Sequence, residues 1–155
     1  MKGNEKVIEQ LNMALADELT AINQYMVHSE MCANWGLDEL HEVVEKRAIQ
    51  EMKHAEELIA RILFFDGRPI VSNLNPIHIG ADVPAQLSND LAAEVDAVAK
   101  YNAGIKLAVE AGDNGSRDLL ESILGDEEDH VDWLEAQLYQ IEQMGIAAYL
   151  VEQVG

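Results

Sequence analysis

Two short segments of the sequence contain the same pair of residues, a glutamate followed three positions later by a histidine. They are Glu51 with His54 and Glu127 with His130, so the two copies lie 76 positions apart. On a helix, residues three apart project from one face about a turn apart. Each pair can therefore offer a carboxylate and an imidazole to one metal site.

A third acid joins each pair, because the same offset carries Glu18 onto Glu94. Six potential ligands thus form two matching triplets. Four hard oxygen donors and two imidazoles suit Fe(II), Fe(III) or Mn(II), whereas structural zinc usually takes four ligands with sulfur among them. Cys32 is the only cysteine, which excludes an intrachain disulfide and a rubredoxin-type iron site and favours a small, reduced core residue.

The residue types predict two metal ions that share some of their ligands. The six ligands divide into two bridges and two terminal pairs: Glu51 and Glu127 as bridges, Glu18 with His54 on one metal, and Glu94 with His130 on the other. Bridging carboxylates tolerate the change from ferrous to ferric iron by shifting their coordination. A two-electron reaction with dioxygen or peroxide then becomes accessible.

Four long helices must position these ligands. Apolar residues recur at intervals of three and four over about Glu5 to Ala33, Glu39 to Phe65, Ala85 to Ala111, and from a Ser116 cap to Gly145. Each helix has one of the four glutamates within its inner apolar stripe. The short turn at Gly36, with Asp38 capping the next helix, predicts antiparallel neighbours.

Unpaired carboxylates at one level of an apolar bundle would be strongly destabilising, since burying each charge costs several kcal/mol. They could instead stay protonated or pair with lysine or arginine. None of the four stripes has a basic residue at those levels. Metal ions therefore explain the pattern better than either alternative.

The second and third helices are joined by a long connector, Asp66 to Ala85, which contains all three prolines. It can run the length of a helix and make the third helix parallel to the second, as in the ferritin-like bundle. We expect one all-α domain over 1–155, with the bundle over 5–145. A short, apolar fifth helix over 146–155 either folds back on its own bundle or packs against other subunits. We expect the second, because the four-helix core is complete without it.

The formal charge of −19 argues against nucleic acid as a partner, since phosphate binding needs clustered lysine and arginine. An acidic surface attracts cations, although the same charge also maintains solubility. The chain has no apolar signal region and no run long enough to span a membrane. We expect a cytoplasmic location.

The chain resembles the bacterioferritins over essentially its full length. The resemblance is carried by Glu18 with Asn23-Gln24-Tyr25, Trp35-Gly36-Leu37, Glu51 to Ala55, Arg61 to Phe64, Glu127, and Asp129 to Leu134. It implies a 24-subunit cage built from dimers, which oxidises Fe(II) with O2 or H2O2 at a di-iron centre and stores a ferric mineral. It also implies a ferredoxin-type reductant for iron release.

Met52 lies one position past Glu51, about 100° around the helix, and so cannot share the di-metal site. By sequence alone it is a packing residue. The resemblance implies instead that it is a haem ligand, with one methionine from each of two subunits binding a b-type haem. Residues on the faces that could line the haem pocket are Leu19, Ile22, Asn23, Met26 and Ile49.

The resemblance also implies roles that this chain keeps or lacks. Tyr25 and Trp133 are either local electron donors or core aromatics. Lys46 and Gln50 replace the ligands of an additional inner-wall iron site, so that site is not expected. Leu58 and Glu45 replace tyrosines of some relatives, and His28, His41 and His78 have no counterpart in the repeat. The histidines are expected at the surface or an interface, with His28 the first candidate for an exception.

Two other functions fit the same ligands. A rubrerythrin-like or catalase-like di-metal enzyme would reduce peroxide without storing iron, although a single cysteine excludes a typical rubredoxin domain. A haem-binding dimer or structural cage would use the metals only to stabilise the fold, without catalysis. Resemblance in both halves of the chain favours storage with ferroxidase activity.

Overall fold

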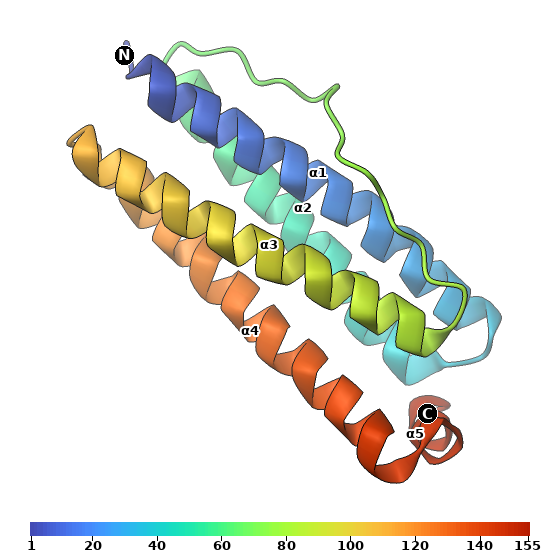
Figure 1. The fold of residues 1–155 in the computed structure, drawn as a ribbon. Helices are drawn as coiled ribbons and strands as arrows, with labels where there is room; N and C mark the ends of the chain where they lie inside the picture. Colours follow the sequence, from blue (N-terminus) through green and yellow to red (C-terminus); the bar gives the residue numbers. More distant parts are fainter.

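The computed structural model describes residues 1–155 and contains five helices and no strands. They are α1 (Glu5–Asn34), α2 (Asp38–Phe64), α3 (Val83–Glu110), α4 (Asn114–Met144) and α5 (Ile146–Gln153). The four long helices lie side by side as a bundle, and α5 lies across one end (Figure 1). The predicted fold class, a four-helix bundle with a short C-terminal helix, is confirmed. None of the helices is long and apolar enough to cross a bilayer.

The helix boundaries lie within a few residues of those predicted, but two caps differ. Asp38 is the first residue of α2, and the residue before it makes no side-chain cap hydrogen bond. At α4 the cap is Asp113, whose carboxylate accepts from the backbone N–H of Ser116 at 3.0 Å. A carboxylate accepts strongly at a helix N-terminus. Arg61 of α2 reinforces this cap with an ion pair to Asp113 at 2.8 Å.

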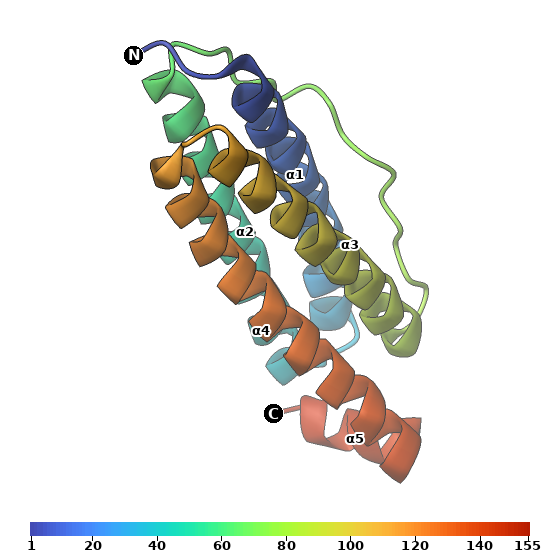
Figure 2. The same ribbon diagram turned by 60° about the vertical axis from the view of Figure 1, so that its left-hand side comes forward.

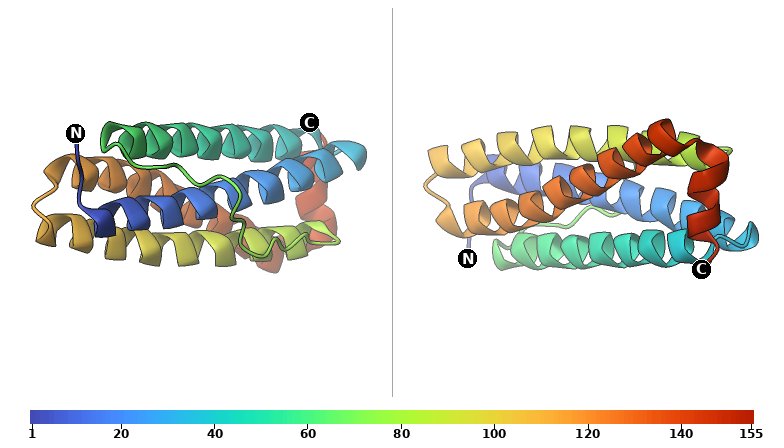
Figure 3. Two further views of the ribbon diagram at one scale, coloured as in Figure 1. Left: turned by 90° about the horizontal axis from the view of Figure 1, so that it is seen from above. Right: turned by 90° about the horizontal axis from the view of Figure 1, so that it is seen from below.

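Helices α1 and α2 form one antiparallel hairpin, and α3 and α4 form the other. Each hairpin turn contains a glycine in the left-handed region, Gly36 at φ 75° and Gly112 at φ 68°, where other residues are strained. The connector over 65–82 runs the length of the bundle beside α1, so α3 starts at the same end as α2 (Figures 1 and 3). The predicted crossover is therefore present.

A row of polar side chains on α1 holds the crossover in place. Four residues whose spacing is a multiple of four each accept a backbone N–H of the crossover: Asn12 from Ile70, Thr20 from Asn75, Gln24 from His78, and His28 from Gly80. Residues four apart share one helix face. His28 is the exception among the three unmatched histidines, because it is fully buried, with Nδ1 2.9 Å from Asp90 Oδ1 of α3.

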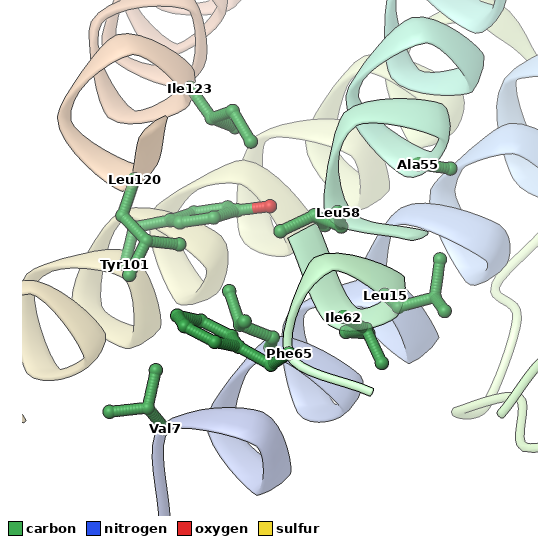
Figure 4. Close-up of a cluster of buried hydrophobic side chains, with 10 residues drawn as sticks. Val7, Leu15, Ala55, Leu58, Ile62, Phe65, Tyr101, Leu120 and Ile123 are labelled. Carbon is green, nitrogen blue, oxygen red and sulfur yellow. The ribbon is translucent and has the colours of Figure 1, made fainter. Parts of the chain in front are cut away.

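The apolar core consists of two clusters. The first gathers near the N-terminus of α1 and includes Leu11, Leu58, Leu120 and Ile123. Figure 4 shows the ring of Tyr101 beside Leu58, Leu120 and Ile123. The second, at the other end of the bundle, includes Tyr25, Leu40, Leu134 and the buried Cys32, whose thiol pKa is raised to about 11 by burial. A polar layer lies between the two clusters.

The fifth helix folds back on its own bundle, so the expectation that it packs against other subunits is wrong for its central residue. Tyr149 is fully buried in the second cluster, and its hydroxyl donates to Gln137 Oε1 at 2.7 Å. Figure 2 shows α5 turned back beneath the end of α4. The four-helix core was not complete without Tyr149. Val151 on the same helix is 70% exposed.

Truncating Leu58 to alanine should destabilise the bundle by about 2–5 kcal/mol, because its fully buried side chain fills the first cluster. Leu63→Ala on the same helix is the matched control, since Leu63 is 56% exposed and should change stability by roughly 0.5 kcal/mol or less. Urea unfolding of both variants measures the difference. Equal effects would contradict the placement of this core.

Candidate metal centre

Each long helix contributes one glutamate to the layer between the two apolar clusters. They are Glu18 from α1, Glu51 from α2, Glu94 from α3 and Glu127 from α4, and none is more than 2% exposed. Within each antiparallel hairpin the two glutamates lie about equally far from the turn, which places them at one height. The structure thus brings all four predicted carboxylates together, along with both histidines.

His54 faces three of these carboxylates through a single ring nitrogen. Its Nδ1 lies 3.1 Å from Glu127 Oε1, 3.4 Å from Glu51 Oε2 and 3.6 Å from Glu18 Oε2. One ligand atom from each of these four residues lies within 4.8 Å of the others, a spacing that can hold a metal ion. This group is the first half of the centre.

His130 faces the carboxylates in the corresponding way. Its Nδ1 lies 3.1 Å from Glu51 Oε1, 3.4 Å from Glu94 Oε1 and 3.7 Å from Glu127 Oε2. Glu51, Glu94, Glu127 and His130 form the second group. Glu51 and Glu127 belong to both groups and direct one oxygen to each histidine, which is the arrangement expected of bridging carboxylates.

One oxygen of every glutamate in the layer makes no hydrogen bond, although it is buried: Glu18 Oε2, Glu51 Oε1, Glu94 Oε2 and Glu127 Oε1. A buried anion without a partner costs several kcal/mol. No lysine or arginine pairs with these four carboxylates. Two metal cations would supply the missing charge, and the hard oxygen and imidazole donors fit iron or manganese.

The crowding of carboxylates alters the proton affinity of the layer. Burial and the neighbouring charge of Glu18 raise the pKa of Glu51 well above its usual value, and burial with Glu127 does the same for Glu94. Burial opposes the charged form of His54, but the facing carboxylates of Glu127, Glu18 and Glu51 outweigh it and raise its pKa. Without metal, the layer therefore retains protons that bound cations would replace.

Comparison with known proteins places this geometry in a family. The model of the ferritin-like domain matches residues 8–144. The bacterioferritin of Rhodobacter capsulatus is 44% identical over 145 residues, which cover 94% of this chain and 90% of the relative. The chain belongs to the bacterioferritin family. The bacterioferritin of Brucella melitensis, at 42% identity, and the bacterial ferritin of Synechocystis, at 41%, each cover more than nine-tenths of both chains.

In this chain the outer nitrogen of each histidine also has a partner, which sequence reasoning missed. His54 Nε2 lies 2.7 Å from Asp126 Oδ2, and His130 Nε2 lies 2.5 Å from Gln50 Oε1. An acceptor at Nε2 favours the tautomer that leaves Nδ1 free to bind metal. A signal was available, because Gln50 and Asp126 each precede a Glu-x-x-His glutamate and are related by the same offset of 76.

Each terminal glutamate is held by a tyrosine of the opposite hairpin. Tyr25 donates to Glu94 Oε1, and Tyr101 donates to Glu18 Oε1 at 2.5 Å. Burial raises the pKa of both tyrosines, so they stay protonated and donate. The second oxygen of each glutamate is buried and makes no hydrogen bond. Sequence reasoning assigned a site role to Tyr25 and none to Tyr101, although the offset of 76 relates them.

The remaining predicted site residues lie outside this layer. Met52 is 45% exposed on α2, in agreement with the predicted turn away from Glu51. Trp133 is half-buried beside Arg47, whose guanidinium lies 5.9 Å from the ring centroid. Gln50, at the position of an inner-wall iron ligand in some relatives, instead lies within hydrogen-bond distance of His130. Lys46 is exposed.

The raised pKa of Glu51 predicts how stability should depend on pH in chelator-treated protein. The pKa of this carboxyl is 4.5 in the unfolded state and higher in the folded state. The folded protein therefore loses stability as pH rises from about 4.5 through the folded pKa. Glu51→Gln removes this loss. The variant should be more stable than the unmodified protein at pH 7 by on the order of 1–3 kcal/mol.

Urea unfolding between pH 4.5 and 8 measures this difference. Glu56→Gln is the matched control, because Glu56 is exposed on the same helix and its replacement should leave the pH profile unchanged. Parallel profiles for the unmodified protein and Glu51→Gln would show that Glu51 does not carry an uncompensated charge.

Proposed function

We propose that this chain is an iron-storage ferroxidase, which oxidises Fe(II) to Fe(III) at the carboxylate layer and stores the ferric product. The observation that carries the proposal is the pair of ligand groups sharing Glu51 and Glu127, each with a buried oxygen that lacks a hydrogen bond. Membership in the bacterioferritin family supports it.

The ligand layer prepares two Fe(II) substrates to react together. Glu18 with His54 and Glu94 with His130 hold one ion each, and the bridging carboxylates keep the ions close enough to act on one oxidant. Each Fe(II) gives up one electron. Dioxygen takes up two electrons and two protons to give hydrogen peroxide, or one hydrogen peroxide takes up the same number to give two waters.

The protein around the layer controls geometry and charge. Tyr25 and Tyr101 fix the terminal glutamates through one oxygen, and the outer acceptors fix the histidines. The carboxylates release their retained protons as cations bind, and those protons are available to the reduced oxygen. Oxidation to Fe(III) increases the positive charge, which the four carboxylates stabilise further.

Storage requires assembly, and we propose a hollow 24-subunit cage of this chain built from dimers, located in the cytoplasm. The net charge of −19 would line its pores and inner wall with carboxylates, which draw in Fe(II) and nucleate mineral. A ferredoxin-type protein would supply the electrons that return Fe(III) to Fe(II) for release.

Met52 is proposed to bind a b-type haem together with the same residue of a second copy. It lies on an exposed apolar face of α1 and α2 with Met26, 50% exposed, and Ile49, 44% exposed. Half-buried residues complete the face: Leu19, Ile22 and Asn23. A thioether is a soft iron ligand, and apolar walls suit a porphyrin, so the residues fit the group.

Glu18→Ala or His130→Ala should abolish the rapid phase of Fe(II) oxidation, because each removes a terminal ligand. Stopped-flow absorbance after aerobic Fe(II) addition measures the phase, and native mass checks assembly. Glu128→Ala is the matched control, since Glu128 is exposed beside Glu127. An unchanged rapid phase would refute the site. Steady peroxide consumption without iron accumulation would favour the rubrerythrin-like or catalase-like alternative.

Met52→Leu should remove the absorption bands of bis-methionine haem and leave the rapid phase of Fe(II) oxidation in place. The reason is that Met52 lies outside the carboxylate layer. Met13→Leu is the matched control, because Met13 is 50% exposed on α1 but does not belong to the Met52 face. Haem bands of equal intensity in Met52→Leu would refute this assignment.

A further inference from the structure

A cavity of about 440 Å³ leads from the surface of the molecule to the carboxylate layer. It lies between α1 and α3, beneath crossover residues that include Asn75 and His78. All four glutamates of the layer line its inner part. Its outer part, the mouth, is lined by Asp17, Asp96, Lys100 and Asn75. The α1 and α3 side of the bundle is therefore open to small ions.

An ammonium group lies at this mouth between two carboxylates. Lys100 Nζ is 3.1 Å from Asp17 Oδ1 and 2.9 Å from Asp96 Oδ2. The same Asp17 oxygen accepts from the side chain of Asn75 on the crossover at 2.5 Å. The mouth therefore has two negative charges, from Asp17 and Asp96, and one positive charge, from Lys100, so its net charge is negative.

The groups at the inner end of the cavity require a cation that Lys100 does not provide. Glu18 Oε2 and Glu94 Oε2 are buried without a hydrogen bond, and both residues line the cavity. Asp17 and Asp96 line the same cavity as these two glutamates. A cation held at the mouth would thus share one continuous space with unpaired oxygens of the layer.

We propose that the mouth is a cation-exchange site, at which a divalent cation displaces the ammonium of Lys100 from Asp17 and Asp96 before it enters the layer. Two carboxylates neutralise a divalent ion fully, whereas the single charge of lysine leaves one anion uncompensated. Lys100 is 41% exposed on a flexible stem, so its ammonium can move into solvent. That the physiological cation is Fe(II) rests on the function proposed above.

A purely structural role for Lys100 gives different expectations. In that case its ion pairs only join α1 to α3, and removing the charge would loosen the bundle without changing metal binding. The two roles are distinguished by cation binding at the mouth, with the thermal midpoint measured alongside.

Mn(II) binding to anaerobic, chelator-treated protein provides the direct test, by calorimetry and electron paramagnetic resonance. We expect one Mn(II) per chain beyond the two at the layer, which Asp17→Asn loses. Lys100→Met should bind that ion roughly tenfold more tightly, because a competing positive charge is gone. Lys106→Met is the matched control, since Lys106 is an exposed lysine of the same helix without an ion pair. The control should bind it as the unmodified protein does.

Kinetics give a second measurement. At Fe(II) concentrations below saturation, Lys100→Met should raise the rate of the rapid phase severalfold and Asp17→Asn should lower it. Equal Mn(II) affinity in the unmodified protein, Lys100→Met and Asp17→Asn would overturn the exchange site, as would an equal gain in Lys106→Met.

The two proposals can fail separately. If Mn(II) binds at the mouth as expected but the unmodified protein does not oxidise Fe(II) rapidly, the ferroxidase proposal fails and the exchange site stands. If oxidation is rapid while the variants bind Mn(II) unchanged, only the exchange site fails.

Discussion

The structure depends on the charge of four glutamates buried at one level of an apolar bundle. Water cannot stabilise them there, and the nearby histidines can neutralise only part of the charge. Two apolar clusters above and below the layer provide the burial that holds it closed. The layer therefore destabilises the folded protein without metal, and relief of this unfavourable free energy strengthens the binding of cations.

An internal repeat explains how the layer is completed. The offset that relates the two Glu-x-x-His pairs also relates Tyr25 to Tyr101 and Gln50 to Asp126. The second relation is not symmetric in charge, because His54 faces the carboxylate of Asp126 whereas His130 faces an amide. A carboxylate at the outer nitrogen makes an imidazole a more basic ligand. The two halves of the centre consequently share geometry but differ in electrostatics.

Periodicity was sufficient to predict the helices and the six clustered residues, because apolar spacing and acidic residues inside apolar stripes are local signals. The crossover was predictable from the length and the prolines of the connector. The partners of those residues were not predictable in the same way. Tyr101 fits an apolar stripe equally well with or without a role at the layer. His28 is buried only because the crossover and α3 cover it, and Tyr149 fills space that exists only after the bundle has formed. The contacts of His28 and Tyr149 join distant parts of the chain and leave no periodic trace, whereas Tyr101, Gln50 and Asp126 are marked only by the offset of 76.

The hydrogen bonds that the two tyrosines and the outer histidine nitrogens make around the layer join one hairpin to the other. Those of the tyrosines connect α1 with α3, and those of the histidines connect α2 with α4. The bridging glutamates likewise come one from each hairpin. A cation bound by Glu51 and Glu127 must therefore hold the two hairpins together. The α2 and α4 side is cross-linked by the histidines, whereas the α1 and α3 side contains the cavity beneath the crossover. The long connector thus sets the direction of α3 and also forms part of the rim through which ions reach the centre.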